Sequence, residues 1–289
     1  MLKIKKVVAT LIITTIVIGG LVGCSSSASK KSAVDKEGTS SIAAIKKRGV
    51  IKIGVFSDKA PFGYLDSNGK NQGFDVYIAK RFAKDLLGDE TKVEFVLVDA
   101  ASRVAYLESN KVDIIMANFT VTDERKEKVD FTNPYMKVSL GIVSPDNAKI
   151  TSIDQLKGKK VIIAKGTTAE AFLTKNYPDI ELVKYEQYSE IFQALKDKRG
   201  DAILSDNTEV IAWAKENPGF TVGIPSLGSA DTIAPAVTKG NTELKDWVNT
   251  ELETLGKENF VHKDYDETLK SVYGAEFEDS LVVEGGIVK

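Results

Sequence analysis

Cysteine and histidine are almost absent from this chain, and their scarcity excludes several kinds of site. Cys24 is the only cysteine and His262 is the only histidine among 289 residues. A single cysteine excludes an intramolecular disulfide and a zinc site built from cysteines. With one histidine, histidine-rich metal sites are excluded as well, and the familiar Ser-His-Asp arrangement of hydrolases is missing. We therefore expect no metal and no other cofactor.

The chain also lacks an excess of positive charge. It has 39 lysines and arginines against 41 acidic residues, for a formal net charge of −2. Removal of residues 1–23, which hold three lysines and no acid, would bring this charge to −5. Because phosphate binding requires a basic face, nucleic acid is not expected as a partner.

The N-terminus carries an apolar run that is too short for a membrane-spanning helix. Three lysines precede the run, which covers residues 7–18, whereas a bilayer span needs about 20 apolar residues. A basic start, a short apolar stretch and small residues before a break are typical of a secretory signal. The sequence Leu21-Val22-Gly23-Cys24 resembles the bacterial lipobox, which implies cleavage before the cysteine and diacylation of its sulfur. We expect a signal peptide at 1–23 and a lipidated Cys24.

Residues 25–41 have the composition of a linker. They are rich in serine, lysine, glycine and alanine and contain almost no large apolar side chain. Such a segment is typical of a flexible tether. We predict that residues 24–41 hold the folded part, which begins at Ile42, at the extracytoplasmic side of a membrane. Cells with one membrane and cells with two both use the lipobox, so the cell surface and the periplasmic face both remain open.

From Ile42 onward, short apolar runs alternate with helical patterns. The clearest helix covers 75–87, where apolar residues recur at the helical period and Gly88 follows as a stop signal. The expected strands are 50–56, 92–98, 112–117, 161–164, 181–185 and 201–204, with a hairpin turn at 66–69. The other expected helices are 102–109, 168–176, 190–196, 208–216 and 242–255. Alternation in two groups predicts open α/β sheets in two lobes with a crevice between them.

Ligands of open α/β sheets bind beyond the carboxyl ends of the strands, and four polar clusters occupy such positions. The clusters cover residues 57–58, 118–125, 166–168 and 205–207. One cluster would be ordinary turn chemistry, but four that follow strands of both lobes indicate a shared binding crevice.

Two of these clusters are suited to binding a carboxylate. Thr122 is a natural N-cap residue, and Arg125 in the same turn can bind both oxygens of a carboxylate with its guanidinium. The alternative is an ordinary capped helix with Arg125 in solvent. Gly166, Thr167 and Thr168 open a second helix and would add donors to the same carboxylate, unless they form a plain turn.

Asp206 and Arg103 are the other charged candidates. A carboxylate in a closed crevice needs a charged partner, because desolvation of an isolated charge is costly. Asp206 is therefore predicted to bind an α-ammonium, and it would also suit the first turn of the helix that follows. Arg103 is one of five arginines in a lysine-rich chain. This suggests a use for its fork geometry, although a surface ion pair is the commoner role.

Taken together, these segments resemble the polar amino-acid family of solute-binding proteins that serve ABC importers. The resemblance rests on Thr120-x-Thr122-x-x-Arg125, Asp130-Phe131, Pro134-Tyr135, Gly166-Thr167-Thr168 and Leu204-Ser205-Asp206. It implies an α/β, two-lobed fold of the type II periplasmic-binding-protein class, in which each lobe is an open sheet flanked by helices. Lobe 1 would comprise 42–139 and 236–289, lobe 2 would comprise 140–235, and hinge strands would lie near 136–143 and 232–237.

The resemblance also implies a role for each candidate residue. Arg125, Thr120 and Thr168 would bind the α-carboxylate of an amino acid. Asp206 and the carbonyl group of Asn118 would bind its α-ammonium. The further contacts would come from Asp58, Phe62, Tyr64, Arg103, Phe119 and Thr167, with Phe62 and Tyr64 lying over the ligand and Arg103 near its side chain.

The ligand's identity rests on a finer likeness. Ala101-Ser-Arg103 resembles receptors for acidic amino acids and for cysteine, which place an arginine near the ligand's side chain. Gly54-Val-Phe-Ser-Asp58 and Pro61-Phe-Gly-Tyr64 are similar to sequences of bacterial cysteine-binding surface lipoproteins. This implies L-cysteine, ahead of aspartate or glutamate and then cystine. The implied partners are the permease and ATPase of an ABC importer, with the chain acting as a monomer and not as an enzyme. Two alternatives stay open here, namely an enzyme resembling cyclohexadienyl dehydratases and a surface adhesin.

Overall fold

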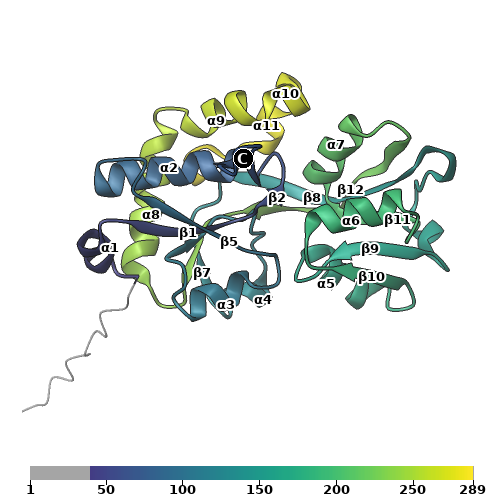
Figure 1. Ribbon diagram of the computed structural model, residues 1–289, viewed down its shortest axis with the longest axis horizontal. Coiled ribbons are helices and arrows are strands. Elements are labelled where there is room, and N and C mark those ends of the chain that lie inside the picture. The colour runs from purple at the N-terminus through teal and green to yellow at the C-terminus, as the bar shows by residue number, and fades with distance from the viewer. Residues whose placement is uncertain (1–39, 289) are drawn as a thin grey trace, which may run out of the picture. The chain divides into compact units, whose positions relative to one another are not determined.

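The computed structural model describes residues 40–288 (Figure 1). The predicted signal peptide, the lipidated Cys24 and the predicted tether up to residue 39 lie outside these residues. Within 40–288, no helix is both long and apolar enough to cross a membrane.

Two five-stranded mixed sheets form the framework of the fold. The first sheet has the order β5-β1-β6-β13-β7, and the second has the order β10-β9-β11-β8-β12. The strands of the first sheet are β1 (Ile51–Val55), β5 (Val93–Leu97), β6 (Ile114–Ile115), β7 (Val129–Phe131) and β13 (Ala236–Thr238). Those of the second are β8 (Met136–Pro145), β9 (Lys160–Ala164), β10 (Glu181–Tyr185), β11 (Ala202–Asp206) and β12 (Phe220–Ile233). A small antiparallel sheet adds β2 (Asp58–Lys59), β3 (Gly63–Leu65) and β4 (Asn71–Gln72).

In both sheets, parallel strands direct their carboxyl ends to one edge. Strand β1 pairs in parallel with β5 and β6, and β9 pairs in parallel with β10 and β11. Strand β13 pairs antiparallel with β6 and β7 in the first sheet, and β8 pairs antiparallel with β11 and β12 in the second. This mixed topology confirms the expectation of α/β sheets flanked by helices.

Helices cover the faces of the sheets. Around the first sheet lie α1 (Ile42–Arg48), α2 (Phe74–Leu87), α3 (Arg103–Glu108), α4 (Asp123–Lys126), α8 (Thr242–Gly256), α9 (Phe260–Thr268), α10 (Lys270–Tyr273) and α11 (Glu278–Leu281). Around the second lie α5 (Thr168–Asn176), α6 (Tyr188–Lys196) and α7 (Asn207–Glu216). Short 3-10 turns cover Asp146–Ala148, Ile153–Leu156, Ala275–Phe277 and Glu284–Gly286.

Local signals fix several of these elements where the sequence predicts them. Helix α2 ends at Gly88, whose φ of 81° is the left-handed conformation that glycine adopts without a Cβ clash. Helix α5 begins after Thr167, whose side chain accepts a hydrogen bond from the backbone N–H of Glu170. The hairpin between β3 and β4 turns at Gly69, with a φ of 73°.

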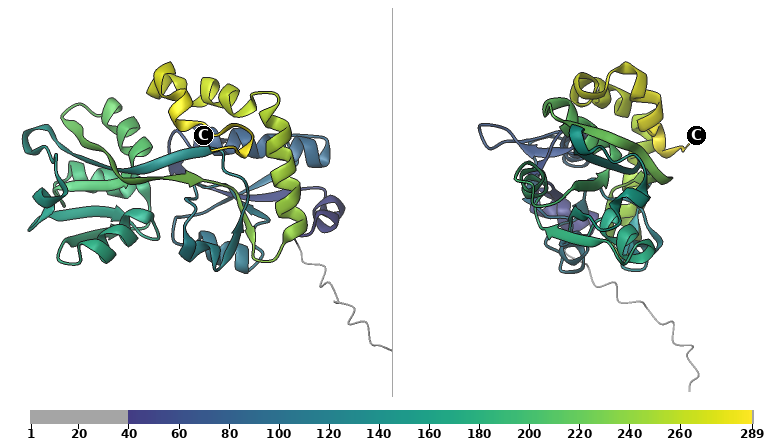
Figure 2. Two further views of the ribbon diagram at one scale, coloured as in Figure 1. Left: turned by 180° about the vertical axis from the view of Figure 1, so that it is seen from behind. Right: turned by 90° about the vertical axis from the view of Figure 1, so that its right-hand side faces the viewer.

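Two long strands connect the sheets. Figure 2 shows β8 and β12 running together between the two sheets, and they pair as an antiparallel ladder with three register shifts. At the first sheet, Met136 forms a bridge with Val282, and Ile233 forms one with Thr120. The hinge strand expected at 232–237 is interrupted, because Pro235 has no N–H for the ladder and separates β12 from β13.

The apolar core has a part that belongs to both sheets. One cluster lies between the first sheet and α2, α8 and α9, and another lies within the second sheet and α5. A third includes side chains from both, and in it Phe56 meets Tyr188 edge to face, with 5.2 Å between the ring centroids. Close approach of α7 to β8 depends on Gly141, where an added Cβ would lie 2.9 Å from the Cα of Asn207. The helix that follows Asp206 is thereby held against β8.

Candidate functional site

The structure brings three of the four predicted polar clusters into contact, and the fourth contacts a helix of the second sheet. The side-chain amide of Asn118 donates to Oδ2 of Asp206 at 3.0 Å, and Nη2 of Arg125 donates to the carbonyl of Gly166 at 2.9 Å. From the cluster after β1, Oδ2 of Asp58 accepts from the backbone N–H of Ser189 at 2.9 Å. Each of these bonds joins residues that follow strands of different sheets, as the carboxyl-end argument predicts.

Asn118 occupies an unusual backbone position that directs its side chain into the site. Its φ is 42°, a left-handed conformation that asparagine tolerates better than most residues. Its amide nitrogen bonds Asp206, while its side-chain oxygen is buried with no hydrogen-bond partner. Its backbone carbonyl, the predicted ammonium ligand, accepts a 3.3 Å hydrogen bond from Nη1 of Arg103. The side chain of Asn118 therefore contributes to the site together with its backbone.

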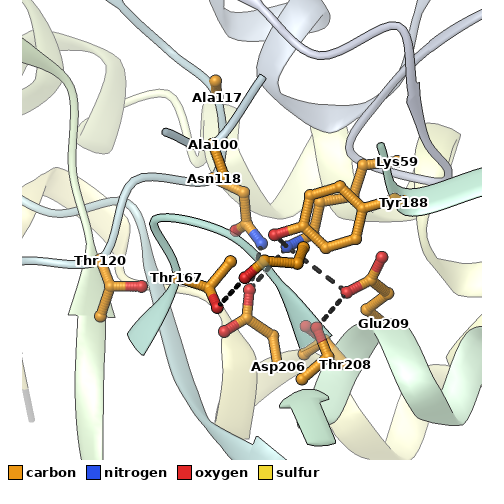
Figure 3. Close-up of polar contacts among 12 residues, drawn as sticks. Lys59, Ala100, Ala117, Asn118, Thr120, Thr167, Tyr188, Asp206, Thr208 and Glu209 are labelled. Carbon is orange, nitrogen blue, oxygen red and sulfur yellow. Dashed lines mark hydrogen bonds and ion pairs between the residues drawn. The ribbon is translucent and has the colours of Figure 1, made fainter. Parts of the chain in front are cut away.

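Lys59 lies at the centre of the site, and sequence reasoning did not identify it (Figure 3). Its side chain comes from β2 and is fully buried among groups of the second sheet and its helices. Nζ lies 2.7 Å from Oδ2 of Asp206, 3.1 Å from the hydroxyl of Tyr188 and 3.6 Å from Oε2 of Glu209. It also lies 4.2 Å from the centroid of the Tyr188 ring. Lys59, Asn118, Tyr188, Asp206 and Glu209 are called the Asp206 cluster below.

Opposite charges keep Lys59 in its cationic form. Burial acts to lower the pKa of Lys59, but the charges of Asp206 and Glu209 outweigh burial and raise the pKa above its usual value. Burial raises the pKa of Glu209 to about 7, against the opposing effects of Lys59 and Ser205. Burial also raises the pKa of Tyr188 to about 12, so its hydroxyl stays protonated. The cluster thus holds a cation beside Asp206 and a carboxyl group that titrates near neutral pH.

Arg103 is buried and joins the two sheets through backbone carbonyls. It donates from Nε to Ala100 at 2.9 Å, from Nη1 to Ala117 at 3.0 Å and from Nη2 to Gly166 at 3.2 Å. Its guanidinium lies 4.4 Å from the centroid of the Phe119 ring. Burial lowers the pKa of Arg103. The surface ion pair considered for this residue is not what the structure contains.

Arg125 also lies close to the Phe119 ring. Thr122 caps α4 by accepting from the backbone N–H of Arg125 at 3.2 Å, as the sequence predicts. Nη1 of Arg125 donates to the carbonyl of Thr120 at 2.7 Å, and the guanidinium is 4.8 Å from the centroid of the Phe119 ring. Burial, followed by repulsion from Arg103, lowers the pKa of Arg125 to about 9.

A cavity of about 720 Å³ adjoins Arg125 and lies between segments of both sheets. Phe119 and Arg125 line it from one side, and Thr167 and Thr168 at the start of α5 line it from the other. The Thr167 hydroxyl donates to the carbonyl of Ala164 at 2.7 Å. Thr120 is buried next to this wall and carries the carbonyl that Arg125 binds.

Phe62 and Tyr64, the two aromatic side chains expected over the ligand, do not lie beside Asp206. Phe62 is completely buried in the hydrophobic cluster of the first sheet, where its backbone carbonyl accepts from the N–H of Asp75 at 3.0 Å. Tyr64 is half-buried in β3, paired with Asp58 and Gln72. Neither side chain joins the Asp206 cluster. The rings of Phe56 and Tyr188 lie near the ammonium group of Lys59, and the ring of Phe119 lies near Arg103 and Arg125.

A buried carboxyl group supports the site from behind. Oδ2 of Asp75 accepts from the backbone N–H of Asn118 at 2.7 Å, and Oδ1 accepts from the hydroxyl of Tyr135 at 2.5 Å. Burial raises the pKa of Asp75 to about 7, although both hydrogen bonds favour the charged form. Asp75 thus fixes the turn that presents Asn118 to Asp206. Among residues 40–288, no group of three or more metal-binding side chains is assembled, at this site or elsewhere.

Comparison with known proteins finds relatives that are solute-binding proteins. The family of bacterial extracellular solute-binding proteins, family 3, matches residues 51–269. The chain is 33% identical over 271 residues to the ABC transporter glutamine-binding protein GlnH of Bacillus subtilis, covering 92% of this chain and 98% of that protein.

Two solved structures are more similar in sequence. The solute receptor for L-cysteine of Neisseria gonorrhoeae is 56% identical, with a TM-score of 0.83 over 84% of this chain and 100% of that one. The cysteine-binding protein of Campylobacter jejuni is 55% identical, with a TM-score of 0.83 over 84% of this chain and 98% of that one. These relatives confirm the type II periplasmic-binding-protein fold. They are solute-binding proteins and not enzymes, which removes the dehydratase alternative.

The raised pKa of Asp75 predicts a pH dependence of stability. In the unfolded chain its pKa is near 3.8 and in the fold it is about 7. The unfolded state therefore loses its proton first as pH rises. The stabilisation that protonated Asp75 adds to the free energy of unfolding is fully present below about pH 4. It is lost as pH rises through 7, and the loss amounts to at most about 4 kcal/mol.

Asp75→Asn should remove this part of the pH dependence. We expect the fall in unfolding free energy between pH 5 and pH 8, measured with urea, to be smaller in the variant than in the natural protein. Exposed Asp146→Asn should retain the natural fall. Equal falls in the natural protein and in Asp75→Asn would contradict the assignment.

Proposed function

Because the chain belongs to family 3 of the bacterial extracellular solute-binding proteins, we propose that it is the L-cysteine receptor of an ABC importer, anchored through Cys24. At the coarser level, it is an amino-acid-binding protein for ABC import. The proposal adds the ligand, the residues that hold it and the lipid anchor. The observation that carries it is the pairing of a carboxylate-binding side, at Arg125, with an ammonium-binding side, at Asp206, across segments of both sheets.

Arg125 binds the α-carboxylate in this proposal. It lines the cavity opposite Thr168, at the start of the nine-residue helix α5. A guanidinium presents five N–H donors, so a ligand carboxylate is bound by those that the Thr120 and Gly166 carbonyls do not use. The N-terminus of α5 and the hydroxyl of Thr168 supply further donors.

Asp206 binds the α-ammonium. It is 7% exposed, and Lys59 and Asn118 both donate to its Oδ2 atom. Its Oδ1 atom then accepts from the ligand. The unpartnered side-chain oxygen of Asn118 lies in the same cluster and provides a second acceptor, since the ammonium carries three N–H donors.

The choice of cysteine is supported by the two solved receptors, which are named for L-cysteine or cysteine and are 56% and 55% identical to this chain. The relative from Bacillus subtilis named for glutamine shares 33%. Lys59 and Arg103 add a chemical reason, because they put positive charge near a small polar or anionic side chain of the ligand. Aspartate or glutamate, followed by cystine, are the competing ligands.

Binding and delivery follow from two sheets that are linked by β8 and β12. The ligand first contacts residues around the first sheet, and rotation about the two connecting strands brings Thr168 and Asp206 onto it. Closure excludes water and strengthens each charge-assisted hydrogen bond. The closed, loaded protein is the form that the permease recognises.

Calorimetric titration of the purified folded part with cysteine, cystine, aspartate, glutamate and glutamine tests the ligand. We expect cysteine, kept reduced, to bind most tightly. Tighter binding of glutamate or aspartate would replace cysteine in the proposal while leaving the receptor function in place. An absence of heat with all five amino acids would contradict the amino-acid site itself.

Arg125→Ala should weaken binding of the preferred amino acid by about 2–5 kcal/mol, because the ligand carboxylate is left buried without its charged partner. Arg199→Ala is the matched control, since Arg199 is exposed and interacts with Asp197 and Tyr185. Titration of both variants measures the effect. Affinity within a few-fold of the natural protein for Arg125→Ala would remove Arg125 from the site.

Cys24→Ser should abolish lipid attachment. When the full chain is expressed in a bacterium with radiolabelled palmitate, we expect label on the natural protein and on Ser25→Ala, and none on Cys24→Ser. The unlabelled variant should also leave the membrane fraction, because a thioether-linked diacylglyceryl group is what holds the protein there. Label on Cys24→Ser would overturn the anchor.

A further inference from the structure

Lys59 does not itself bind the carboxylate or the ammonium group of the ligand in the proposed function. Within residues 40–288, it is the only lysine that is buried, with 1% of its surface exposed. Its ammonium group is surrounded by Asp206 on β11, Glu209 on α7 and Tyr188 on α6. Burying a lysine is costly unless it is paired, and here the pairing is with the carboxylate that receives the ligand.

We propose that Lys59 is a specificity-determining residue that makes the site reject amino acids with a cationic side chain and accept those with a small neutral or anionic one. The inference rests on the proposed amino-acid site. It concerns which class of side chain is admitted, and not the binding of the α-ammonium or the α-carboxylate.

The position of Lys59 puts its charge close to any ligand held by Asp206. Nζ is 2.7 Å from Oδ2 of Asp206. A ligand ammonium bonded to the same carboxylate lies about 5–7 Å from Nζ, given hydrogen bonds of about 2.8 Å. The side chain of the ligand branches from the carbon that bears this ammonium. A second positive charge on that side chain therefore meets Lys59 at short range, in surroundings from which water is largely excluded.

Two further cations strengthen the discrimination. Arg103 and Arg125 lie 4.4 and 4.8 Å from the centroid of the same Phe119 ring. The proximity of Arg103 already contributes to lowering the pKa of Arg125. Repulsion between cations is thus a property of this site before any ligand is considered. An anionic or strongly accepting side chain is attracted by the same three groups.

Lys59 also neutralises the acidic groups that would otherwise attract a cation. Asp206 and Glu209 both face its ammonium group, and Oε1 of Glu209 is buried with no hydrogen-bond partner. Without the lysine, two carboxyl groups and an unused acceptor would remain beside the ligand. Such surroundings suit a second ammonium, so removal of Lys59 should favour the ligands that it excludes.

The test compares L-cysteine with L-2,4-diaminobutyrate, a short amino acid whose side chain ends in an ammonium group. Dissociation constants for both are measured at pH 8 for the natural protein, Lys59→Met and Lys59→Arg. We expect the preference for cysteine over diaminobutyrate to fall at least about tenfold in Lys59→Met. Lys59→Arg keeps the charge and should retain the preference. Lys160→Met, which removes an exposed lysine paired with Glu181, should retain it as well.

Each outcome separates the two proposals. If the natural protein binds neither cysteine nor any other amino acid, the proposed function fails and this inference falls with it. If it binds, and the preference is unchanged in Lys59→Met, only the role of Lys59 is overturned. Equal weakening of both ligands in that variant would show a structural role and would also overturn it.

Glu209→Gln keeps the test decisive if Lys59→Met does not fold. It removes a carboxylate that compensates Lys59 while leaving the lysine in place. The preference for cysteine over diaminobutyrate should then rise about threefold or more at pH 8, where the Glu209 carboxyl group, with a pKa of about 7, is ionised in the natural protein. An unchanged or reduced preference in this variant would contradict the charge mechanism.

Discussion

Lys59 and Asp206 come from different sheets and approach to 2.7 Å, and the geometry of the whole site is arranged around this ion pair. Charges removed from water require partners with good geometry, and each member of the Asp206 cluster supplies one to its neighbour. Tyr188 covers the lysine, Asn118 fixes the carboxylate, and Glu209 balances the remaining charge. A buried ion pair of this kind adds little net stability, but it makes one relative position of the two sheets electrostatically favourable.

The antiparallel pair of β8 and β12 connects the two sheets and allows them to adopt that relative position. These strands belong to the second sheet, yet their ends bridge to Val282 and Thr120 around the first. They are joined by backbone hydrogen bonds that are interrupted at three register shifts. The sheets are also linked by polar contacts and by the shared hydrophobic cluster in which Phe56 meets Tyr188. A change in the angle between the sheets would therefore have to open this shared cluster and these polar contacts, whereas the interior of each sheet is fixed by its own core.

The sequence predicts the fold closely where local signals are strong. Helix α2, with its terminal glycine, and helix α5, with its N-cap threonine, are found at their predicted positions within one residue. Strand β12 is not foreseen, because glycines and Pro225 interrupt its apolar pattern and its pairing with β8 depends on a distant segment. The predicted boundaries between lobe 1 and lobe 2, at 139–140 and 235–236, remain predictions. The first falls inside β8 and the second falls next to Pro235.

The candidate site is predicted in part, for reasons that lie in the residues themselves. Asp206, Asn118 and Arg125 follow strands, and the carboxyl-end rule brings them together before any coordinates are known. Lys59 carries no such signal, because a lysine beside an aspartate in a short turn usually lies in solvent. Its burial depends on α6 and α7, which begin about 130 and 150 residues later. The resemblance implies that Phe62 lies over the ligand, but its side chain packs in the core with residues of α2.

The left-handed backbone at Asn118 restricts how this receptor can diversify. With a φ of 42°, the position disfavours β-branched and bulky residues and is open mainly to glycine, asparagine and aspartate. Glycine would widen the site and withdraw an amide from Asp206, and aspartate would place a like charge beside it. Evolution at position 118 is therefore limited to about three residue types, and each of them gives a binding site of different volume and charge. A single codon change there alters the volume and charge of the site without remodelling the chain around it.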